Sequence, residues 1–266
     1  MNSKPLWGKR VVITRAADQS AGLEAALSAV GAECILFPTL VFEAMPDARM
    51  FDSAVARLSD HDWLVLTSSN GVHFFFERLG QQRLPESVRI AVVGSATNAA
   101  LAKLGYAADL MPEEFTGGEL AQYFESSDVA LDGRSILLPQ GNLARPLLKE
   151  QLEAQGADVH AVSVYQTLPA QPSTEAAKEL QGGVDAITFT SPSTIAYFSE
   201  IVQDFARQAD GINIELDTLR RDAAIACIGP VTAKAAQDLG WDPHVIADPH
   251  TAAGLVQGLL TYFNRA

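Results

Sequence analysis

The chain has 266 residues, of which 48% are hydrophobic, and a formal net charge of −13. This acidity argues against nucleic acid or an acidic membrane surface as a partner. The apolar runs are too short to span a membrane and the N-terminus lacks an apolar signal segment, so a soluble cytoplasmic protein is expected. Cys34 and Cys227 lie in apolar strand-like runs, which is typical of core residues in a reducing compartment.

The first half of the chain alternates short apolar runs with amphipathic segments, a pattern typical of parallel strands joined by helices. A helix carrying Leu23 and Leu27 on one face is predicted to end at Gly31. Pro38 interrupts the extended run 33–42, which favours an edge strand or a linker there. The other expected strands are 8–14, 63–66 and 90–93, and the other expected helices are 51–58, 72–79 and 98–104.

The second half shows the same alternation. Ser191 and Pro192 have the chemistry of a helix N-cap and a first helical residue. A turn is expected at 139–144, between a strand and the next helix. The expected strands and extended runs are 134–138, 158–167, 186–189 and 224–228, and the expected helices are 147–154 and 255–263.

Much of this pattern occurs twice in the sequence. Residues 90–120 match residues 225–255 at an offset of 135, and both copies contain a Gly-x-x-Thr turn, a Leu-Gly helix stop and an expected second strand. Blocks beginning at Leu6 and Asp62 recur at offsets of 125 and 123. A repeated strand-helix-strand unit predicts two similar α/β domains, each with a doubly wound parallel sheet. The connections between the domains are expected near 36–42 and 163–172.

The loops after the apolar strands are the expected place for a ligand. In open α/β sheets, ligands bind beyond the carboxyl ends of the strands, where helix N-termini offer free N–H groups to anions. Five such loops contain no carboxylate, whereas they do contain Arg145 and Lys234. A single Ser or Thr at such a place is more often only a helix cap. The same uncharged chemistry in all five loops favours an anion site.

Familiar catalytic and cofactor motifs are missing. The sequence contains no phosphate loop, no nucleophile elbow and no G-x-G-x-x-G dinucleotide motif. The five histidines lack the spacing of metal ligands. Neither a metal nor an organic cofactor is therefore expected.

Five short blocks identify a family resemblance: TSSNGV at 67–72, VVGSAT at 92–97, VSVYQT at 162–167, FTSPSTI at 189–195 and IGPVTA at 228–233. In this order they resemble uroporphyrinogen-III synthase, and the resemblance covers essentially the whole chain. It implies that the first βα unit crosses over to the C-terminal domain and that a two-stranded β linker joins the domains. The implied domains are 1–39 with 168–266, and 40–167. The implied active site is the cleft between them.

The resemblance also implies a reaction. The family cyclises hydroxymethylbilane, a linear tetrapyrrole with eight carboxylates, to uroporphyrinogen III with inversion of the last ring, and it uses no cofactor. The first ring loses its hydroxyl group to give an azafulvene, which the last ring attacks to form a spiro intermediate. Because the bilane also closes unaided without inversion, positioning is the main demand. Transient contact with the preceding enzyme of the pathway is a further expectation.

Tyr165 is the candidate catalytic residue. It lies on a predicted connection, matches the family's VYQT tyrosine, and its phenol can donate a hydrogen bond to the leaving hydroxyl group. The alternative is a strand residue that only packs its ring.

The candidate substrate-binding residues follow from their places at strand ends and from the resemblance. Arg15 and Arg145 are the expected cations, with surface arginines as the alternative, and Thr97 and Thr232 occupy the repeated Gly-x-x-Thr position, with helix capping as theirs. Family members often carry arginine where Gln140 stands. The full set is Thr14, Arg15, Ser68, Ser69, Asn70, Gly94, Ser95, Thr97, Gln140, Gly141, Asn142, Arg145, Thr190, Ser191, Ser193, Gly229, Pro230 and Thr232.

Two other functions fit the same pattern. A non-enzymatic two-domain sensor or carrier of small anions would also use polar loops on duplicated α/β domains. Such a carrier has no particular need of a proton donor at Tyr165. A catalytically silent paralogue is the other alternative.

Overall fold

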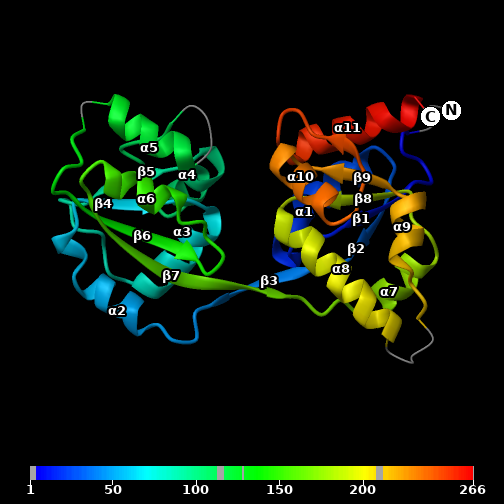
Figure 1. Cartoon of the computed structure of the whole chain (residues 1–266), viewed down its shortest axis with the longest axis horizontal. Helices are drawn as coiled ribbons and strands as arrows, with labels where there is room; N and C mark the ends of the chain where they lie inside the picture. The colour runs from blue at the N-terminus through cyan, green and yellow to red at the C-terminus, as the bar shows by residue number, and fades with distance from the viewer. Residues whose placement is uncertain (1–3, 113–116, 128, 208–211, 266) are drawn as a thin grey trace. The chain divides into compact units, whose positions relative to one another are not determined.

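The computed structural model describes residues 4–112, 117–127, 129–207 and 212–265. Its contacts divide the chain into two compact units, each with its own sheet. Unit 1 consists of Met1–Val41 and Leu168–Ala266, and unit 2 of Phe42–Thr167. In Figure 1 the blue N-terminal strands therefore lie among the yellow to red elements of unit 1. Within the described ranges, no helix is long and apolar enough to cross a membrane.

Unit 1 is built on a five-stranded parallel sheet with the order β10-β9-β8-β1-β2. Side chains alternate between its faces: Val12 and Ile187 pack in one core, and Val11 and Ala186 in the other. The strands are β1 (Arg10–Ile13), β2 (Glu33–Leu36), β8 (Ala186–Phe189), β9 (Ala224–Cys227) and β10 (Pro243–Ile246). The first core is covered by α7 (Thr174–Gln181), α8 (Pro192–Arg207), α9 (Leu216–Asp222) and α10 (Pro230–Asp238), and the second by α1 (Ala17–Ala29) and α11 (Ala252–Arg265).

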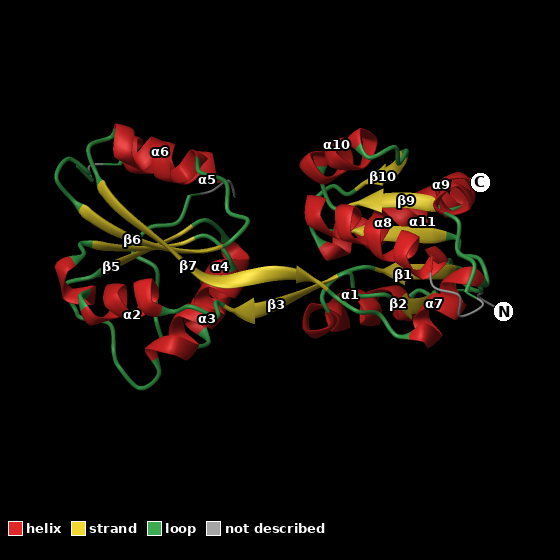
Figure 2. Cartoon of the chain, turned by 60° about the horizontal axis from the view of Figure 1, so that its bottom comes forward, coloured by secondary structure: helices red, strands yellow, loops and turns green. Residues whose placement is uncertain are grey.

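Unit 2 has a second five-stranded sheet, ordered β3-β7-β6-β4-β5, in which β7, β6, β4 and β5 are parallel. The strands are β3 (Leu40–Ala44), β4 (Trp63–Leu66), β5 (Arg89–Val92), β6 (Ser135–Gly141) and β7 (Asp158–Pro169). Helices α5 (Gly117–Ser126) and α6 (Leu147–Ala154) cover one face, whereas α2 (Arg49–Ala56), α3 (Ser69–Leu79) and α4 (Ser95–Ala102) cover the other. Figure 2 shows α5 and α6 on one side of the strands and α2 and α3 on the other. A 3-10 turn, η1 (Leu58–Asp60), precedes β4.

The two sheets repeat each other strand by strand. At the offsets found in the sequence, β6, β4 and β5 correspond to β1, β8 and β9, and they are neighbours in the same relative order, β6-β4-β5 and β1-β8-β9. The register agrees as well, since Arg10 pairs with Glu33 in unit 1 and Ser135 with Asp158 in unit 2. The copies differ after the Leu-Gly stop: unit 1 has β10 there, whereas the described residues of unit 2 up to 112 form a single bridge at Leu110. Within the described residues, the expected second strand is thus present in unit 1 and not in unit 2.

The predicted fold class is confirmed: the chain forms two α/β domains with parallel sheets, and β1 and β2 join the sheet of the C-terminal part. The predicted turn at 139–144 is wrong at its start, because β6 continues to Gly141. Pairing with β7 alone carries β6 there, since its pairing with β4 ends at Leu137. The sequence pattern does not predict α7 or α9, two short helices of 8 and 7 residues.

Candidate functional site

The candidate residues lie at the carboxyl ends of the strands in both units. Because neighbouring strands are parallel, these ends share one edge of each sheet. In unit 2 they follow β4 (Ser68, Ser69, Asn70) and β5 (Gly94, Ser95, Thr97), end or follow β6 (Gln140, Gly141, Asn142, Arg145), or lie in β7 (Tyr165). In unit 1 they follow β1 (Thr14, Arg15), β8 (Thr190, Ser191, Ser193) and β9 (Gly229, Pro230, Thr232).

Tyr165 is half-buried near the end of β7 and faces Gly141 of β6. Its ring stacks on Phe74, with centroids 5.4 Å apart and planes at 20°, and meets Phe42 edge-on at 5.8 Å. The phenol oxygen lies 3.4 Å from Ser68 Oγ, at the start of α3. The ring is therefore held on its sides by apolar groups while its hydroxyl group points to a polar helix end. This arrangement suits a hydrogen-bond donor to a bound substrate.

The helix N-termini at these edges are of two kinds. Ser68 caps α3, because its Oγ accepts the N–H of Gly71 at 2.9 Å. Helices α4 and α10 instead begin after Gly94 and Gly229, which have no side chain to cap them. The first N–H groups of an uncapped helix suit an anion, although α10 offers them only from Val231 on, because its first residue is Pro230. Thr97 and Thr232 occupy the same position of these two helices, and both side chains are almost fully buried.

Thr14 contributes to the core of unit 1 rather than to an open surface. Its side chain is fully buried, and its Oγ1 donates to the carbonyl of Thr188 at 2.6 Å. Its own carbonyl accepts the N–H and the Oγ1 of Thr39. These bonds join the ends of β1 and β8 to the segment after β2. The hydroxyl group of Thr14 is not brought to the candidate site.

Other candidate residues of unit 1 are only partly buried. Arg15 is half-buried and forms no ion pair with the residues that the structure describes. Burial lowers the pKa of its guanidinium, and nearby Asp18 partly offsets this effect. Ser191 Oγ lies 3.0 Å from Ser193 Oγ and accepts the N–H of Thr194 at 3.3 Å, so both serines are tied to the start of α8.

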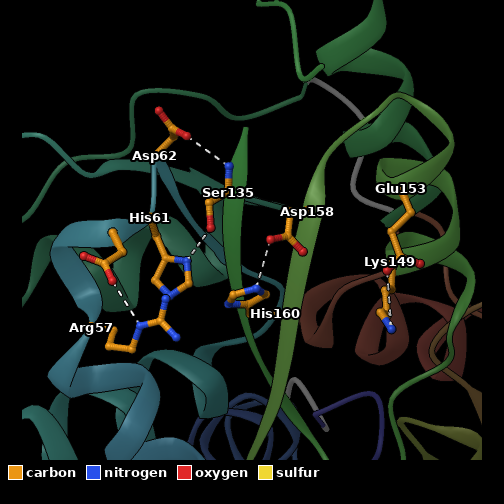
Figure 3. Close-up of polar contacts among 9 residues, drawn as sticks. Arg57, His61, Asp62, Ser135, Lys149, Glu153, Asp158 and His160 are labelled. Carbon is orange, nitrogen blue, oxygen red and sulfur yellow. Dashed lines mark hydrogen bonds and ion pairs between the residues drawn. The ribbon is translucent and has the colours of Figure 1, made fainter. Parts of the chain in front are cut away.

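The opposite edge of the unit 2 sheet also carries polar groups, but they are largely paired with one another (Figure 3). Asp62 accepts the N–H of Ser135, and His61 Nδ1 lies 2.8 Å from Ser135 Oγ. His160 and Asp158 form a further pair at 3.1 Å. None of the candidate residues lies in this cluster. No group of three or more possible metal ligands occurs among the described residues.

Sequence reasoning missed Phe74 and Phe42, the two rings that hold Tyr165. The run Phe74 to Phe76 gives α3 an unusually aromatic face, but the sequence alone assigns it no contact. Phe42 follows Pro38 in a segment that could be taken for a linker. The pairing of β3 with β7 brings it to Tyr165.

Fold and strand-end loops together define a duplicated α/β protein with open helix N-termini for anionic groups. A family model described as uroporphyrinogen-III synthase HemD matches residues 21–257. The chain belongs to the uroporphyrinogen-III synthase family. Members of this family are cyclising lyases of tetrapyrrole biosynthesis. Membership of the family therefore does not favour the alternative of a non-enzymatic carrier.

Curated and solved relatives agree with this assignment. A uroporphyrinogen-III synthase from Synechococcus elongatus is 34% identical over 262 residues, which is 96% of each chain. The Escherichia coli enzyme is 24% identical over 257 residues, covering 94% of this chain and 99% of its own. A solved synthase mutant from Thermus thermophilus, 19% identical, covers 97% of this chain and 100% of its own with a TM-score of 0.64. The Helicobacter pylori synthase, 15% identical, covers 95% and 98% with a TM-score of 0.62, and both structures show the shared fold.

Proposed function

We propose that this protein is a uroporphyrinogen-III synthase that cyclises hydroxymethylbilane with inversion of the last ring. The observation that carries the proposal is Tyr165, the family's tyrosine, which lies at the carboxyl edge of its sheet with its phenol oxygen 3.4 Å from Ser68 Oγ. Membership of the family and the relative at 34% identity support it. A carrier of small anions would have no use for a proton donor at this place.

Carboxylates of the bilane would bind at the strand-end loops that carry the candidate residues. The starts of α4 and α10, which no side chain caps, suit carboxylates, because the amides of the first turn and the helix dipole both favour negative charge. Ser191 and Ser193 add hydroxyl groups at the start of α8. Arg15 and Arg145 add positive charge, and a half-buried guanidinium such as that of Arg15 binds a carboxylate more strongly than an exposed one.

Chemistry at Tyr165 would begin the reaction. Its phenol donates a hydrogen bond to the hydroxyl group of the first ring, which leaves as water while the ring nitrogen gives up its proton to form the azafulvene. The last ring then attacks through its substituted carbon, and the spiro intermediate breaks and recloses with that ring inverted. Since the uninverted closure needs no enzyme, the strand-end loops must hold the folded bilane in the geometry of the inverted closure. Transient contact with the preceding enzyme would limit the time in which free bilane closes wrongly.

The test is to incubate the purified protein with enzymatically generated hydroxymethylbilane and to separate the product isomers. The proposal predicts mainly the type III isomer, formed faster than the spontaneous closure. A product that is type I alone, formed at the rate seen without protein, would overturn it. Measuring bilane binding in the same samples distinguishes a carrier, which would bind the bilane without changing the isomer.

A further inference from the structure

A bulge determines which residue of β6 faces Tyr165. The strands pair in regular register up to Gln140 opposite Ser163, and the next pair is Gly141 opposite Tyr165. One residue of β7, Val164, is therefore extra. Such a bulge redirects the side chains that follow it, and bulges are common beside active sites. Here it brings the Tyr165 ring over the backbone of Gly141.

Gly141 leaves the space that the ring occupies. A Cβ atom at this position would lie 2.6 Å from Cζ of Tyr165 and 2.8 Å from its phenol oxygen, well inside van der Waals contact. The backbone itself does not require glycine, because Gly141 is not among the residues with positive φ. The room for the tyrosine ring is thus the feature that only glycine provides.

Phe74 is the second neighbour that restricts the position of the Tyr165 ring. Its ring lies nearly parallel to that of Tyr165, at 20° and 5.4 Å, in the offset range that aromatic pairs prefer. Phe74 belongs to α3, the helix that Ser68 caps. The same helix therefore fixes both the face of the tyrosine ring and the polar group 3.4 Å from its oxygen.

We propose that Gly141 and Phe74 are positioning residues for Tyr165, which together hold its phenol at the start of α3. The inference rests on the proposed function, in which Tyr165 assists the loss of water. Neither residue needs to touch the reacting atoms. Each acts by excluding other positions of the ring, and a displaced phenol would donate its hydrogen bond less well.

Two substitutions test whether Gly141 and Phe74 position the Tyr165 ring, and each has a matched control. Gly141→Ala adds the obstructing Cβ, whereas Gly22→Ala adds the same group where nothing lies within 4 Å. Phe74→Leu removes the stacked ring, whereas Phe76→Leu removes a half-buried ring of the same helix that contacts Tyr106 instead. We expect kcat to fall about 10- to 100-fold in both test variants, with KM less affected, and to stay near wild type in both controls.

A double-mutant cycle shows whether the loss of kcat in Gly141→Ala depends on the hydroxyl group of Tyr165. In the Tyr165→Phe background, Gly141→Ala should cost no more than about twofold further, because no hydroxyl group remains to be misplaced. An equal loss in both backgrounds would overturn the proposal, as would an unchanged kcat in Gly141→Ala. Thermal midpoints are measured alongside, and Phe74→Leu serves if Gly141→Ala fails to fold.

A second measurement does not depend on activity. In protein with labelled tyrosine rings, the Tyr165 resonance is assigned by its absence in Tyr165→Phe, and it should shift in Gly141→Ala and Phe74→Leu but not in the controls. A Tyr165 resonance that does not shift in these variants would contradict the proposed positioning role of Gly141 and Phe74, even if the enzyme is active. Conversely, if the wild-type protein makes no type III isomer but the resonance shifts in the two variants, the contacts of Gly141 and Phe74 with the Tyr165 ring are supported and the proposed function is rejected.

Discussion

The two sheets are alike at the edge where their strands begin. In unit 2, Asp62 accepts the N–H of Ser135 at 2.9 Å and pairs with Arg134 at 2.8 Å. In unit 1, Asp185 does the same with the N–H of Arg10 at 2.9 Å and with Lys9 at 2.8 Å. Asp62 stands just before β4 and ties it to β6, and Asp185 stands just before β8 and ties it to β1. The duplicated chain has kept this device for joining strands in both copies.

The sheets differ at the edge where their strands end. At the offset of 125, Gly141 corresponds to Ala16 and Tyr165 to Leu40, the first residue of β3, and both Ala16 and Leu40 are buried. The first copy of the repeat therefore has neither the phenol nor a glycine at the equivalent positions. The edge where the strands begin has thus kept its role in assembly, whereas the edge where they end has diverged and carries the proposed chemistry in unit 2.

Tyr165→Phe should cause the largest loss of turnover. Losing the phenol should slow turnover on the order of 10- to 1000-fold with little change in thermal midpoint, because the ring keeps its packing on Phe74 and Phe42. Steady-state kinetics with hydroxymethylbilane measure it. Tyr123→Phe, at an exposed site of α5, is the control. Unchanged turnover, or a loss explained by unfolding, would return Tyr165 to packing alone.

Asp62→Ala and Asp185→Ala should each lower the free energy of unfolding by about 2 kcal/mol while the folded enzyme keeps its turnover, since each leaves a strand N–H without its acceptor. Denaturant unfolding and kinetics measure the two quantities. Asp47→Ala, which removes an exposed ion pair with Arg49, should change neither. If only one of the two substitutions lowered the free energy of unfolding, Asp62 and Asp185 would not have equivalent roles in the two sheets.

Arg15→Gln should raise KM for the bilane about tenfold and leave kcat nearly unchanged, because a cation that binds a carboxylate throughout the reaction contributes uniform binding. The half-buried Arg15 has no ion-pair partner among the described residues. Arg49→Gln, whose guanidinium is paired with Asp47, is the matched control. A fall in kcat with KM unchanged would assign Arg15 a role in the transition state instead.

His61→Asn should have the smallest effect, which is measured as a change in the pH dependence of stability. Burial lowers the pKa of His61 and neighbouring His160 lowers it further, against the opposing effect of Asp60 and Asp158. The folded state therefore binds the proton less readily than the unfolded state, so stability is fully present above the unfolded pKa of about 6.5 and is lost as pH falls below it.

Unfolding midpoints at pH 7.5 and about 5.5 test this effect. The wild type should lose more stability on acidification than His61→Asn does. His73→Asn, at an exposed position of α3, should keep the wild-type slope. Identical slopes in all three proteins would show that His61 does not titrate differently in the folded state.

Much of the fold could be predicted because its signals are local or repeated. Buried strands such as β4 and β8 are short apolar runs with the predicted bounds, and the duplication fixes their correspondence. The strand ends then follow from parallel pairing. By contrast, α9 is a polar seven-residue helix that buries only Leu219, so no periodic apolar face marks it.

The detailed site depends on contacts that no local pattern encodes. The shift between Gln140 and Gly141 is a property of strand register, which a sequence fixes only through the packing of the whole sheet. Without it, neither the role of Gly141 nor the stacking on Phe74 can be foreseen. Thr14 shows the converse, since a polar residue at a strand end can turn into the core when a carbonyl such as that of Thr188 accepts its hydroxyl group.

In the proposed division of labour, Tyr165 assists the loss of water, while the strand-end loops impose the inverted closure. The isomer composition made by Tyr165→Phe, after subtraction of the spontaneous background, tests this division. Turnover should be slow but should still yield mainly the type III isomer, because the binding loops are intact. Product that is type I alone, as in the absence of protein, would contradict it.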